Sequence, residues 1–335
     1  MACVPAANKD RRLTAKGETA LFPAMLELVL PFPNMGRYAI PIWTAHSIGI
    51  RWYALSYIAG LMFGWWAAAR MTREKGLWKN PTFGGKAPIT ADQIGDLVVW
   101  ATFGVILGGR IGWILFYGTA LCGVSPESGM CHVAGGTLPY AFVTNPWNLI
   151  TIWQGGMSFH GGLAGVAVAV WLFCRKHTLP LLAVADMIAV VAPVGLFFGR
   201  IANFVNGELW GKVTDVPWAM VFCTPNIIKD FGRCPAGLEP RHPSQLYEAA
   251  LEGLVLFVLL QIGLRYFKLN ERPGLLTGLF FTGYGVFRFF VEFFREPDGP
   301  FLGWFSMGMA LSIPLWAAAG AFLYFALKPH VNGRA

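Results

Sequence analysis

Seven apolar stretches constrain this chain more than any other feature. They lie at approximately 47–69, 94–117, 157–174, 180–201, 244–264, 274–294 and 304–327. Each is close to the roughly 20 residues that a helix needs to cross the hydrocarbon core of a bilayer. Only 13% of the residues are charged and 55% are hydrophobic, whereas soluble domains carry about 25% charged residues. The sequence therefore predicts an all-α polytopic membrane protein with about seven transmembrane helices.

The predicted domain organisation has three parts. Residues 1–45 form an N-terminal segment that we expect to be partly disordered or to lie on the membrane surface. Residues 46–328 form a single seven-helix transmembrane domain, and residues 329–335 form a tail. The predicted external loops of the domain are 118–156, 202–243 and 295–303, and they carry its turn-rich and polar material. Function concentrates in elaborated loops, so we expect the chemistry on the side of the membrane where these loops lie.

Lysine and arginine residues predict the orientation, because cytoplasmic loops carry an excess of them. Twelve lie in one set of loops and in the tail: Arg70, Arg73, Lys75, Lys79, Lys86, Arg175, Lys176, Arg265, Lys268, Arg272, Lys328 and Arg334. Five lie in the opposite loops: Lys212, Lys229, Arg233, Arg241 and Arg295. Five more in the N-terminal segment argue the other way, but we expect the short loops to dominate. The N-terminus is therefore predicted outside and the C-terminus in the cytoplasm.

The basic excess and the cysteines exclude several classes of function. A net charge of +8 belongs first to the cytoplasmic loops of a membrane protein, so it gives no reason to expect a nucleic-acid partner. The six cysteines show no CxxC pair and no Cys/His spacing typical of a metal site. No nucleotide-binding motif is present either. We therefore expect neither a metal nor another cofactor.

Two pairs of cysteines are candidates for disulfides. Cys122 and Cys131 lie in one predicted external loop, and Cys223 and Cys234 lie in the next. Thiols within reach of each other tend to oxidise outside the cytoplasm. We expect each pair to close a local loop; free thiols and pairing between the loops are the alternatives. Cys174 and Cys3 are not expected to pair.

Residues 195–211 carry an unusual run of polar side chains at the end of an apolar stretch. Arg200 and Asn203 are followed by Asn206 and Glu208, and helical spacing would place Arg200, Asn203 and Gly207 on one face. An arginine at this depth costs several kcal/mol in hydrocarbon unless it has partners. One interpretation is a single arginine reaching the membrane interface. The accompanying amides and acid favour a binding site.

A second charged group lies near the end of the sixth apolar stretch. Arg288, Glu292 and Arg295 stand at i, i+4 and i+7, on one face of a continuous helix. An ion pair without further function is the simpler interpretation. Two arginines beside one glutamate leave excess positive charge, however, and the planar guanidinium group suits phosphate oxygens. We therefore predict an anion-binding role.

Other candidate residues are individually less specific. His160 lies among glycines near the start of the third stretch and could accept a proton, although a hydrogen-bonded core histidine is the usual case. Tyr53 is either an interfacial anchor or a site residue. Arg110 could pair with an acid or bind a lipid phosphate. Glu248 and Glu252 lie one turn apart and are most simply explained as helix polarity near an interface.

Several motifs together resemble a known family. GLFFGRIANFVNGELWG at 195–211 is similar to the signature of bacterial phosphatidylglycerol–prolipoprotein diacylglyceryl transferases, with Ala202 where that signature usually has glycine. SFHGG at 158–162, HPSQLYE at 242–248 and YGVFRFFVEFFREPD at 284–298 resemble the same family. The similarity runs from about residue 46 to the C-terminus.

The resemblance implies the reaction and its partners. The diacylglyceryl group of phosphatidylglycerol would pass to the lipobox cysteine of a prolipoprotein signal peptide, with formation of a thioether and release of glycerol 1-phosphate. The enzyme would lie in the bacterial inner membrane, among its membrane lipids, with a periplasmic N-terminus. An anion or phospholipid transporter is the main alternative, because intramembrane arginines suit that class as well. A purely structural membrane anchor would leave those arginines unexplained.

The resemblance also suggests roles for individual residues. His160 matches an essential histidine and is the candidate base, although the thiol could instead lose its proton to water. Arg200 and Arg288 would stabilise the departing phosphate, and Glu292 would hold Arg288 in place. The remaining substrate-binding candidates are Tyr53, Asn203, Asn206, Glu208, Gly211, Arg295, Arg110 and His242.

Overall fold

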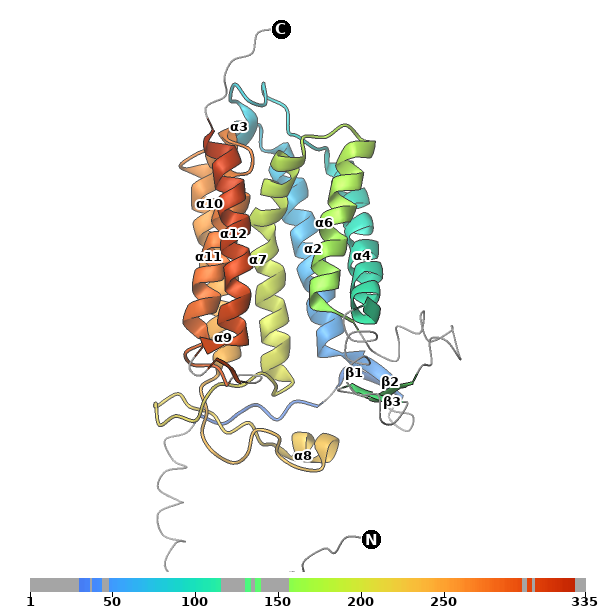
Figure 1. Cartoon of the computed structure of the whole chain (residues 1–335), viewed down its shortest axis with the longest axis vertical. Helices are drawn as coiled ribbons and strands as arrows, with labels where there is room; N and C mark the ends of the chain where they lie inside the picture. Colours follow the sequence, from blue (N-terminus) through green and yellow to red (C-terminus); the bar gives the residue numbers. More distant parts are fainter. Residues whose placement is uncertain are drawn as a thin grey trace, which may run out of the picture.

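A bundle of long helices standing side by side forms the protein (Figure 1). The computed structural model describes residues 30–36, 38–43, 48–115, 130–133, 136–139, 157–296, 300–302 and 305–328. The long helices within these ranges are α2 (Trp52–Arg73), α4 (Ala91–Trp113), α6 (Phe159–Lys176), α7 (Leu181–Val205), the continuous rod α9–η6–α10 (Ser244–Glu248, Ala249–Val255 and Leu256–Arg265), α11 (Leu275–Val291) and α12 (Met307–Leu327). A helix therefore occupies each of the seven predicted apolar stretches.

Four of these helices are long and apolar enough to cross a membrane, judged by length and composition. They are Ala91–Trp113, Leu181–Val205, Ser244–Arg265 and Gly308–Leu327, and Leu275–Val291 is a shorter apolar helix. The outer faces of the bundle are also apolar. On α4, Val99, Phe103, Leu107 and Ile111 form an exposed stripe at intervals of four residues. Such a surface suits lipid rather than water, so the described chain is a mainly helical polytopic membrane protein.

Side-chain caps set several helix boundaries. The Thr90 hydroxyl accepts from the Gln93 amide and the Gln93 side chain accepts from Thr90, which makes a capping box at the start of α4. Ser158 and Ser306 cap α6 and α12 with their side chains, and each accepts one hydrogen bond from a backbone amide of its helix. At the start of α11 the cap comes from another helix. Asp186 of α7 accepts hydrogen bonds from the backbone amides of Gly274 and Thr277.

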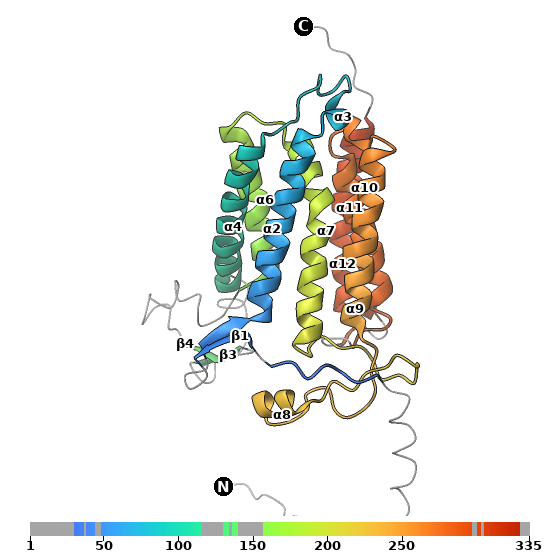
Figure 2. The same ribbon diagram turned by 180° about the vertical axis from the view of Figure 1, so that it is seen from behind.

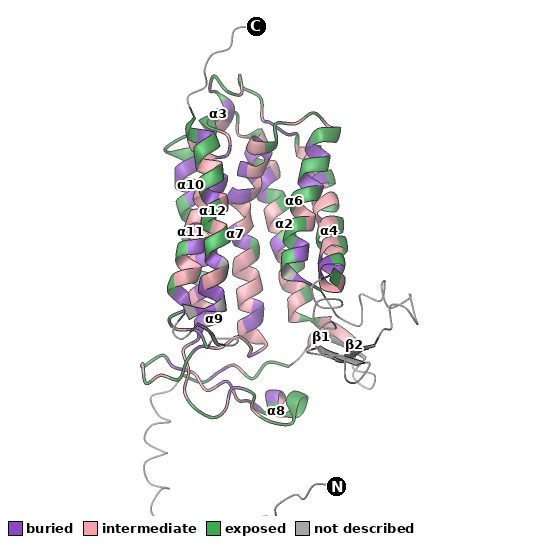
Figure 3. Cartoon of the chain, viewed as in Figure 1, coloured by how far each residue is buried: buried purple, intermediate pink, exposed green. Residues whose placement is uncertain are grey.

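Helix α7 occupies the centre of the bundle, in contact with α2, α6, α9, α10 and α11 (Figures 1 and 2). Buried side chains gather where the helices face one another, and the outward faces are exposed (Figure 3). The main core includes Met71, Phe173, Val190, Leu256 and Leu276. The charged residues of α7 and α11 are therefore held against a packed interior rather than against lipid on all sides.

Glycines bring α4 and α6 into direct backbone contact. Gly104, Gly108 and Gly112 recur every four residues on α4, and they face Gly161 and Gly165 on α6. A Cβ atom at Gly112 would lie 2.6 Å from the Cα of Gly161, which no side chain allows. Small residues at this spacing permit close helix packing in membranes. The glycines beside His160 thus place one helix against another.

Short β-hairpins lie at one end of the bundle, so the all-α expectation was incomplete. β1 (Tyr38–Trp43) pairs with β2 (Ile48–Arg51), with Ile40 opposite Ile50. β3 (Met130–Val133) pairs with β4 (Gly136–Pro139), and β5 (Pro300–Leu302) pairs with β6 (Phe305–Ser306). All three pairs are antiparallel. A hairpin joins two short adjacent segments through a tight turn, whereas a hydropathy profile detects only long apolar stretches. The opposite end carries α3 (Lys75–Trp78) and the single turn η7 (Leu269–Glu271).

A small platform covers the hairpin end of the bundle. It consists of the extended segment 30–36, the loop after α7 and the short helix α8 (Pro225–Phe231). Leu30 donates a backbone hydrogen bond to Ala219 over 3.2 Å. Phe32 packs in a second apolar cluster with Phe222 and Ile227. This part of the N-terminal segment is therefore built into the protein by contacts with residues almost 200 positions away.

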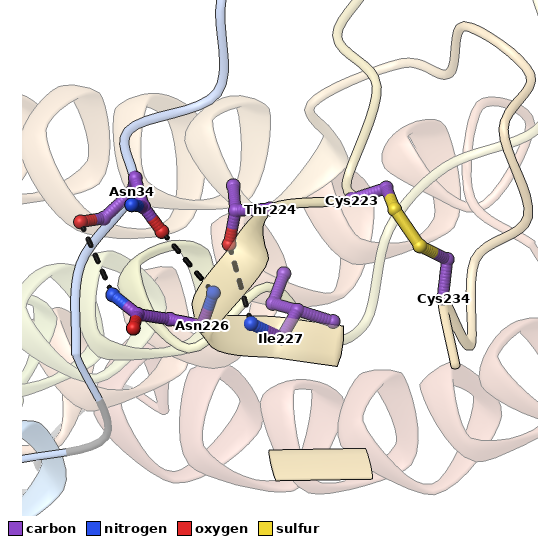
Figure 4. The surroundings of a disulfide bond; sticks show 6 residues. All are labelled: Asn34, Cys223, Thr224, Asn226, Ile227 and Cys234. Atoms are coloured by element: carbon purple, nitrogen blue, oxygen red, sulfur yellow. Dashed lines mark hydrogen bonds between the residues drawn. A yellow bond between two sulfur atoms is a disulfide. The ribbon is translucent and has the colours of Figure 1, made fainter. Parts of the chain in front are cut away.

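The predicted disulfide in this platform is confirmed. Cys223 and Cys234 are joined across the ends of α8, with their Cα atoms 5.2 Å apart (Figure 4). Asn226, in the same helix, donates its backbone amide to the side chain of Asn34 over 3.3 Å (Figure 4). Cys174 is free and buried, as expected. Cys122 lies outside the described residues, so the other predicted pair stays a prediction.

Candidate active site

Six charged side chains, four from helical elements and two from the turn after α11, meet near the hairpin end of the bundle. We call them the arginine–glutamate cluster: Arg200 of α7, Glu248 of α9, Glu252 of η6, Arg288 of α11, and Glu292 and Arg295, which follow α11. The two arginines that the sequence analysis singled out are therefore brought together, although 88 positions separate them along the chain.

Glu248 lies at the centre of this cluster. Its Oε1 is 2.5 Å from Nη1 of Arg288 and 3.8 Å from Nη1 of Arg295. Its Oε2 is 3.2 Å from Nη1 of Arg200. Glu248 is completely buried. A buried carboxylate is tolerated only with such partners, so Glu248 and the arginines hold one another in position.

Each arginine also contacts a second glutamate. Nη2 of Arg200 donates to Oε2 of Glu252 over 3.1 Å. Nη2 of Arg288 lies 2.9 Å from Oε2 of Glu292, which is the i, i+4 pair expected from the sequence. Ser306 donates its hydroxyl to the other oxygen of Glu292 over 2.8 Å. Both guanidinium planes are therefore fixed by two acceptors rather than one.

The balance of charge in the cluster corrects the sequence analysis. Excess positive charge was expected, but three glutamates accompany the three arginines. The glutamates also lie deeper, because the side chains of Glu248 and Glu252 are 0% exposed while those of Arg200 and Arg288 are 17% and 12% exposed. The accessible edge of the cluster therefore consists of guanidinium groups backed by carboxylates. Such an edge suits an anionic ligand.

The helical spacing arguments hold only in part. α7 ends at Val205, and Gly207 has a left-handed φ of 65°, so it does not extend the face of Arg200 and Asn203. α11 ends at Val291, so Arg295 is not on the helical face of Arg288. Arg295 instead lies in a backbone bridge with Gly211. A turn, not a continuous helix, brings Arg295 to Glu248.

A second polar group lies where α2 begins and α7 ends. We call it the tyrosine–amide network. The hydroxyl of Tyr53 donates to Oε1 of Glu208 and accepts from the side-chain amide of Asn203. Asn206 donates to the same glutamate oxygen over 3.2 Å. Four of the predicted substrate-binding residues are therefore in contact with one another.

A single glutamine links this network to the arginine–glutamate cluster. Nε2 of Gln245 donates to the backbone oxygen of Glu208 over 2.6 Å. Gln245 is completely buried and lies one turn before Glu248 on α9. The two polar groups therefore form one continuous region across α2, α7, α9 and α11.

Gly211 and His242 support this region through the backbone. The amide of Gly211 donates to the carbonyl of His242 over 2.9 Å, and a Cβ at Gly211 would lie 2.6 Å from the carbonyl oxygen of Phe294. Only glycine allows three segments to meet so closely. Nδ1 of His242 is 3.0 Å from the hydroxyl of Tyr247. Burial and the nearby Lys212 lower the pKa of His242, which favours the neutral imidazole.

His160 and Arg110 belong to helices that contribute no residue to the cluster. His160 is exposed in the first turn of α6, and α6 lies across α7 from α11 and α12 (Figure 1). The structure thus places His160 at the same end of the bundle as the arginines, on a helix that contacts α7. Arg110 is buried in α4, with its guanidinium carbon 4.6 Å from the ring centre of Trp113. That contact orients Arg110 toward a tryptophan of its own helix.

Glu248 and Glu252 are the residues that sequence reasoning missed. Their spacing of four residues at the start of an apolar helix was the available signal, and it was assigned to interface polarity. The π-helical segment η6 begins directly after Glu248 and contains Glu252. Local π geometry is frequent at functional sites. Within the described residues, no group of His, Cys, Asp or Glu side chains could hold a metal ion.

Comparisons with known proteins agree with the resemblance. The family model for prolipoprotein diacylglyceryl transferase matches residues 41–325. The phosphatidylglycerol–prolipoprotein diacylglyceryl transferase of Agrobacterium fabrum is 47% identical over 302 residues, which cover 88% of this chain and 94% of the relative. The enzyme of the same name from Caulobacter vibrioides is 45% identical over 308 residues, 90% of this chain and 95% of the relative. The chain therefore belongs to the prolipoprotein diacylglyceryl transferase family.

Proposed function

We propose that the arginine–glutamate cluster is the active site of this transferase. The chain is an enzyme of lipoprotein biosynthesis that transfers the diacylglyceryl group from phosphatidylglycerol to a prolipoprotein. The observation that carries the site assignment is the pair Arg200 and Arg288, held side by side by Glu248 with their guanidinium groups partly accessible. A phosphodiester fits this edge because it offers oxygens to both arginines.

The proposed reaction is a displacement at carbon. The thiolate of the lipobox cysteine attacks the glyceryl carbon that bears the phosphate ester. A carbon–sulfur bond forms as the carbon–oxygen bond breaks, and the electron pair leaves with glycerol 1-phosphate. Arg200 and Arg288 stabilise the charge that develops on the leaving phosphate. The proton of the thiol passes to a base, for which His160 is the candidate, or to water.

The tyrosine–amide network is proposed to bind the headgroup. The side chain of Glu208 accepts hydrogen bonds from the side chains of Tyr53 and Asn206. The next residue, Leu209, accepts a hydrogen bond from the Ser244 hydroxyl through its backbone carbonyl. Hydroxyl groups of the glycerol headgroup could exchange into such a network, because it already consists of donors and acceptors at the bundle end. Arg295, Glu292, His242 and Gly211 support the same region by holding its backbone and its arginines.

We also propose the topology that the basic residues predict. The helices α2, α6, α9 and α12 begin at the hairpin end, so every loop at that end would be external, together with the N-terminus. A disulfide lies at this end, which suits an oxidising periplasm. The opposite end holds Arg70, Arg73 and Arg265, as a cytoplasmic face should. The protein would then be a seven-span enzyme of the bacterial inner membrane that meets prolipoprotein signal peptides from the periplasmic side.

Replacing either arginine by lysine tests the site. Lysine keeps the charge but lacks the planar guanidinium fork that binds two oxygens side by side, so Arg200→Lys and Arg288→Lys should each lower transfer by roughly 10²-fold or more. The measurement is transfer of labelled diacylglyceryl from phosphatidylglycerol to a lipobox peptide. Arg265→Lys is the matched control, since Arg265 contacts both Glu74 and Gln261 at the opposite end.

The same assay separates the enzyme from a transporter. Normal transfer by both lysine variants would mean that charge alone suffices, and the geometric argument would fail. Movement of lipid or anion without thioether formation would instead support the transporter.

A further inference from the structure

Glu252 differs from the other two glutamates of the cluster. Glu248 lies near three arginines, and Glu292 has Arg288 and Ser306 as partners. Each of the three glutamates has one oxygen without a hydrogen bond within the described residues, but Oε2 of Glu248 and Oε2 of Glu292 still lie 3.2 Å and 2.9 Å from an arginine nitrogen. Glu252 pairs with one arginine through Oε2, and its Oε1 has neither a hydrogen bond nor an ion pair among those residues. Glu252 is nonetheless completely buried. It is therefore the least neutralised carboxylate in the site.

The formal charges of the cluster already sum to zero before any ligand arrives. A phosphodiester brings one negative charge to the accessible edge of Arg200 and Arg288. The bound state would then contain four negative groups and three positive ones in a region shielded from water. Buried excess charge is strongly disfavoured, and a carboxylate relieves it by taking up a proton.

The surroundings of Glu252 identify it as the acceptor. It faces Arg200 of α7, Glu248 of α9, and Arg288 and Tyr284 of α11. The arginines stay protonated and the phosphodiester stays ionised across the accessible pH range. Protonating Glu252 also weakens its hold on Nη2 of Arg200, which then becomes available to a phosphate oxygen. The change thus removes the excess charge and frees a donor in one step.

We propose that Glu252 takes up one proton from solvent when the phosphate of an anionic phospholipid binds Arg200 and Arg288. The only covalent change is formation of one O–H bond on the carboxylate. This inference rests on the proposed role of the two arginines as the phosphate site. It adds that lipid binding is coupled to protonation, so affinity depends on pH although neither the lipid nor the arginines titrate.

Calorimetry on the detergent-solubilised full-length protein tests the coupling. Binding of dihexanoyl phosphatidylglycerol is measured in buffers of different ionisation enthalpy from about pH 6 to about pH 9, the range that buried carboxyl groups reach. We expect uptake of up to about one proton per lipid, and an affinity that falls by up to about tenfold per pH unit as pH rises. Dihexanoylglycerol, which lacks the phosphate, should cause no uptake.

Variants then assign the proton. Glu252→Gln should bind phosphatidylglycerol without proton uptake and with an affinity independent of pH, because the amide is permanently neutral. Glu252→Asp should retain uptake. Glu74→Gln is the control, since Glu74 also pairs with an arginine but lies at the opposite end of the bundle. Glu248→Gln and Glu292→Gln each remove one negative charge, so the bound cluster is neutral without a proton and these variants should take up less than the wild type; Glu252→Asp, which keeps the carboxylate, carries the test if Glu252→Gln does not fold.

Several results would overturn the inference. They are binding by the wild type without proton uptake, uptake that persists in folded Glu252→Gln, and uptake that disappears in folded Glu252→Asp. The transfer assay on the same preparation keeps the two proposals apart. Transfer without proton uptake would remove the coupling and leave the function intact, whereas a folded protein that neither binds the lipid nor transfers it would contradict the function itself.

Discussion

Three guanidinium groups around one carboxylate explain how this protein buries charge at the end of an apolar bundle. Glu248 has no exposed surface and lies within 4 Å of Arg200, Arg288 and Arg295. Removing one partner of such a group leaves a buried charge without compensation, which lowers the stability of the folded protein by roughly 3–5 kcal/mol. The arginines are thus positioned before any lipid arrives, and preorganised charges stabilise a leaving group without reorganisation.

At the residue scale, His160 offers a decisive test of the proposed base. If it accepts the thiol proton, His160→Gln should lower transfer by roughly 10²-fold or more while leaving binding of phosphatidylglycerol unchanged. The glutamine keeps hydrogen-bonding capacity at an exposed position, so folding should not suffer. The measurement compares turnover with lipid affinity. Turnover close to that of the wild type would exclude His160 and leave water as the proton acceptor.

At the scale of elements, the contact between α4 and α6 depends on the absence of side chains. A Cβ at Gly165 would clash with the backbone oxygen of Gly104, and a Cβ at Gly104 would lie 2.6 Å from the backbone oxygen of Gly165. Because backbone atoms are the obstacles on both sides, a larger residue must push the helices apart. His160 lies in the first turn of α6, so its position depends on this packing.

Alanine at the helix contact should therefore destabilise the protein. Gly165→Ala is expected to cost about 1–3 kcal/mol, the usual effect of overpacking, and to reduce transfer by displacing the first turn of α6. Thermal unfolding in detergent measures the stability. Gly320→Ala in α12 is the matched control, since a Cβ there meets no atom within 4 Å. Equal stability of the two variants would show that α4 and α6 do not need this close contact.

At the scale of the whole molecule, a disulfide cross-links the platform that covers the hairpin end of the bundle. The disulfide between Cys223 and Cys234 encloses α8, and Phe32 and Asn34 attach the N-terminal segment to the same unit. Phe204, at the end of α7, packs against Phe32 with ring centres 5.3 Å apart. The platform is therefore continuous with the helix that carries Arg200 and Asn203.

Loss of the disulfide should loosen this platform. The chain-entropy model assigns about 2–3 kcal/mol to a loop of this size, so the double variant Cys223→Ser, Cys234→Ser should unfold at a lower temperature than the wild type. Reductant should lower the unfolding temperature of the wild type more than that of the double variant, because the predicted Cys122–Cys131 pair is present in both. Alkylation of Cys223 and Cys234 in the wild type without reductant would disprove the bond in the native protein.

The sequence by itself determined the helices, the family and one ion pair. Apolar runs of bilayer length form helices wherever they occur, because the backbone must satisfy its hydrogen bonds locally in lipid. The i, i+4 spacing was enough to pair Arg288 with Glu292, since Glu292 directly follows α11 and keeps a helical backbone conformation. Local rules sufficed for each of these features.

Only the tertiary structure decided what surrounds the arginines. Glu248 and Glu252 reach Arg200 and Arg288 across separations of 40 and more residues, and spacing along the chain contains no information about such contacts. The same holds for Gly207 and Arg295, which were expected on helical faces but follow the ends of their helices. Packing against neighbouring helices sets those ends and decides which charges meet. The balance of three arginines with three glutamates is therefore a property of the folded bundle.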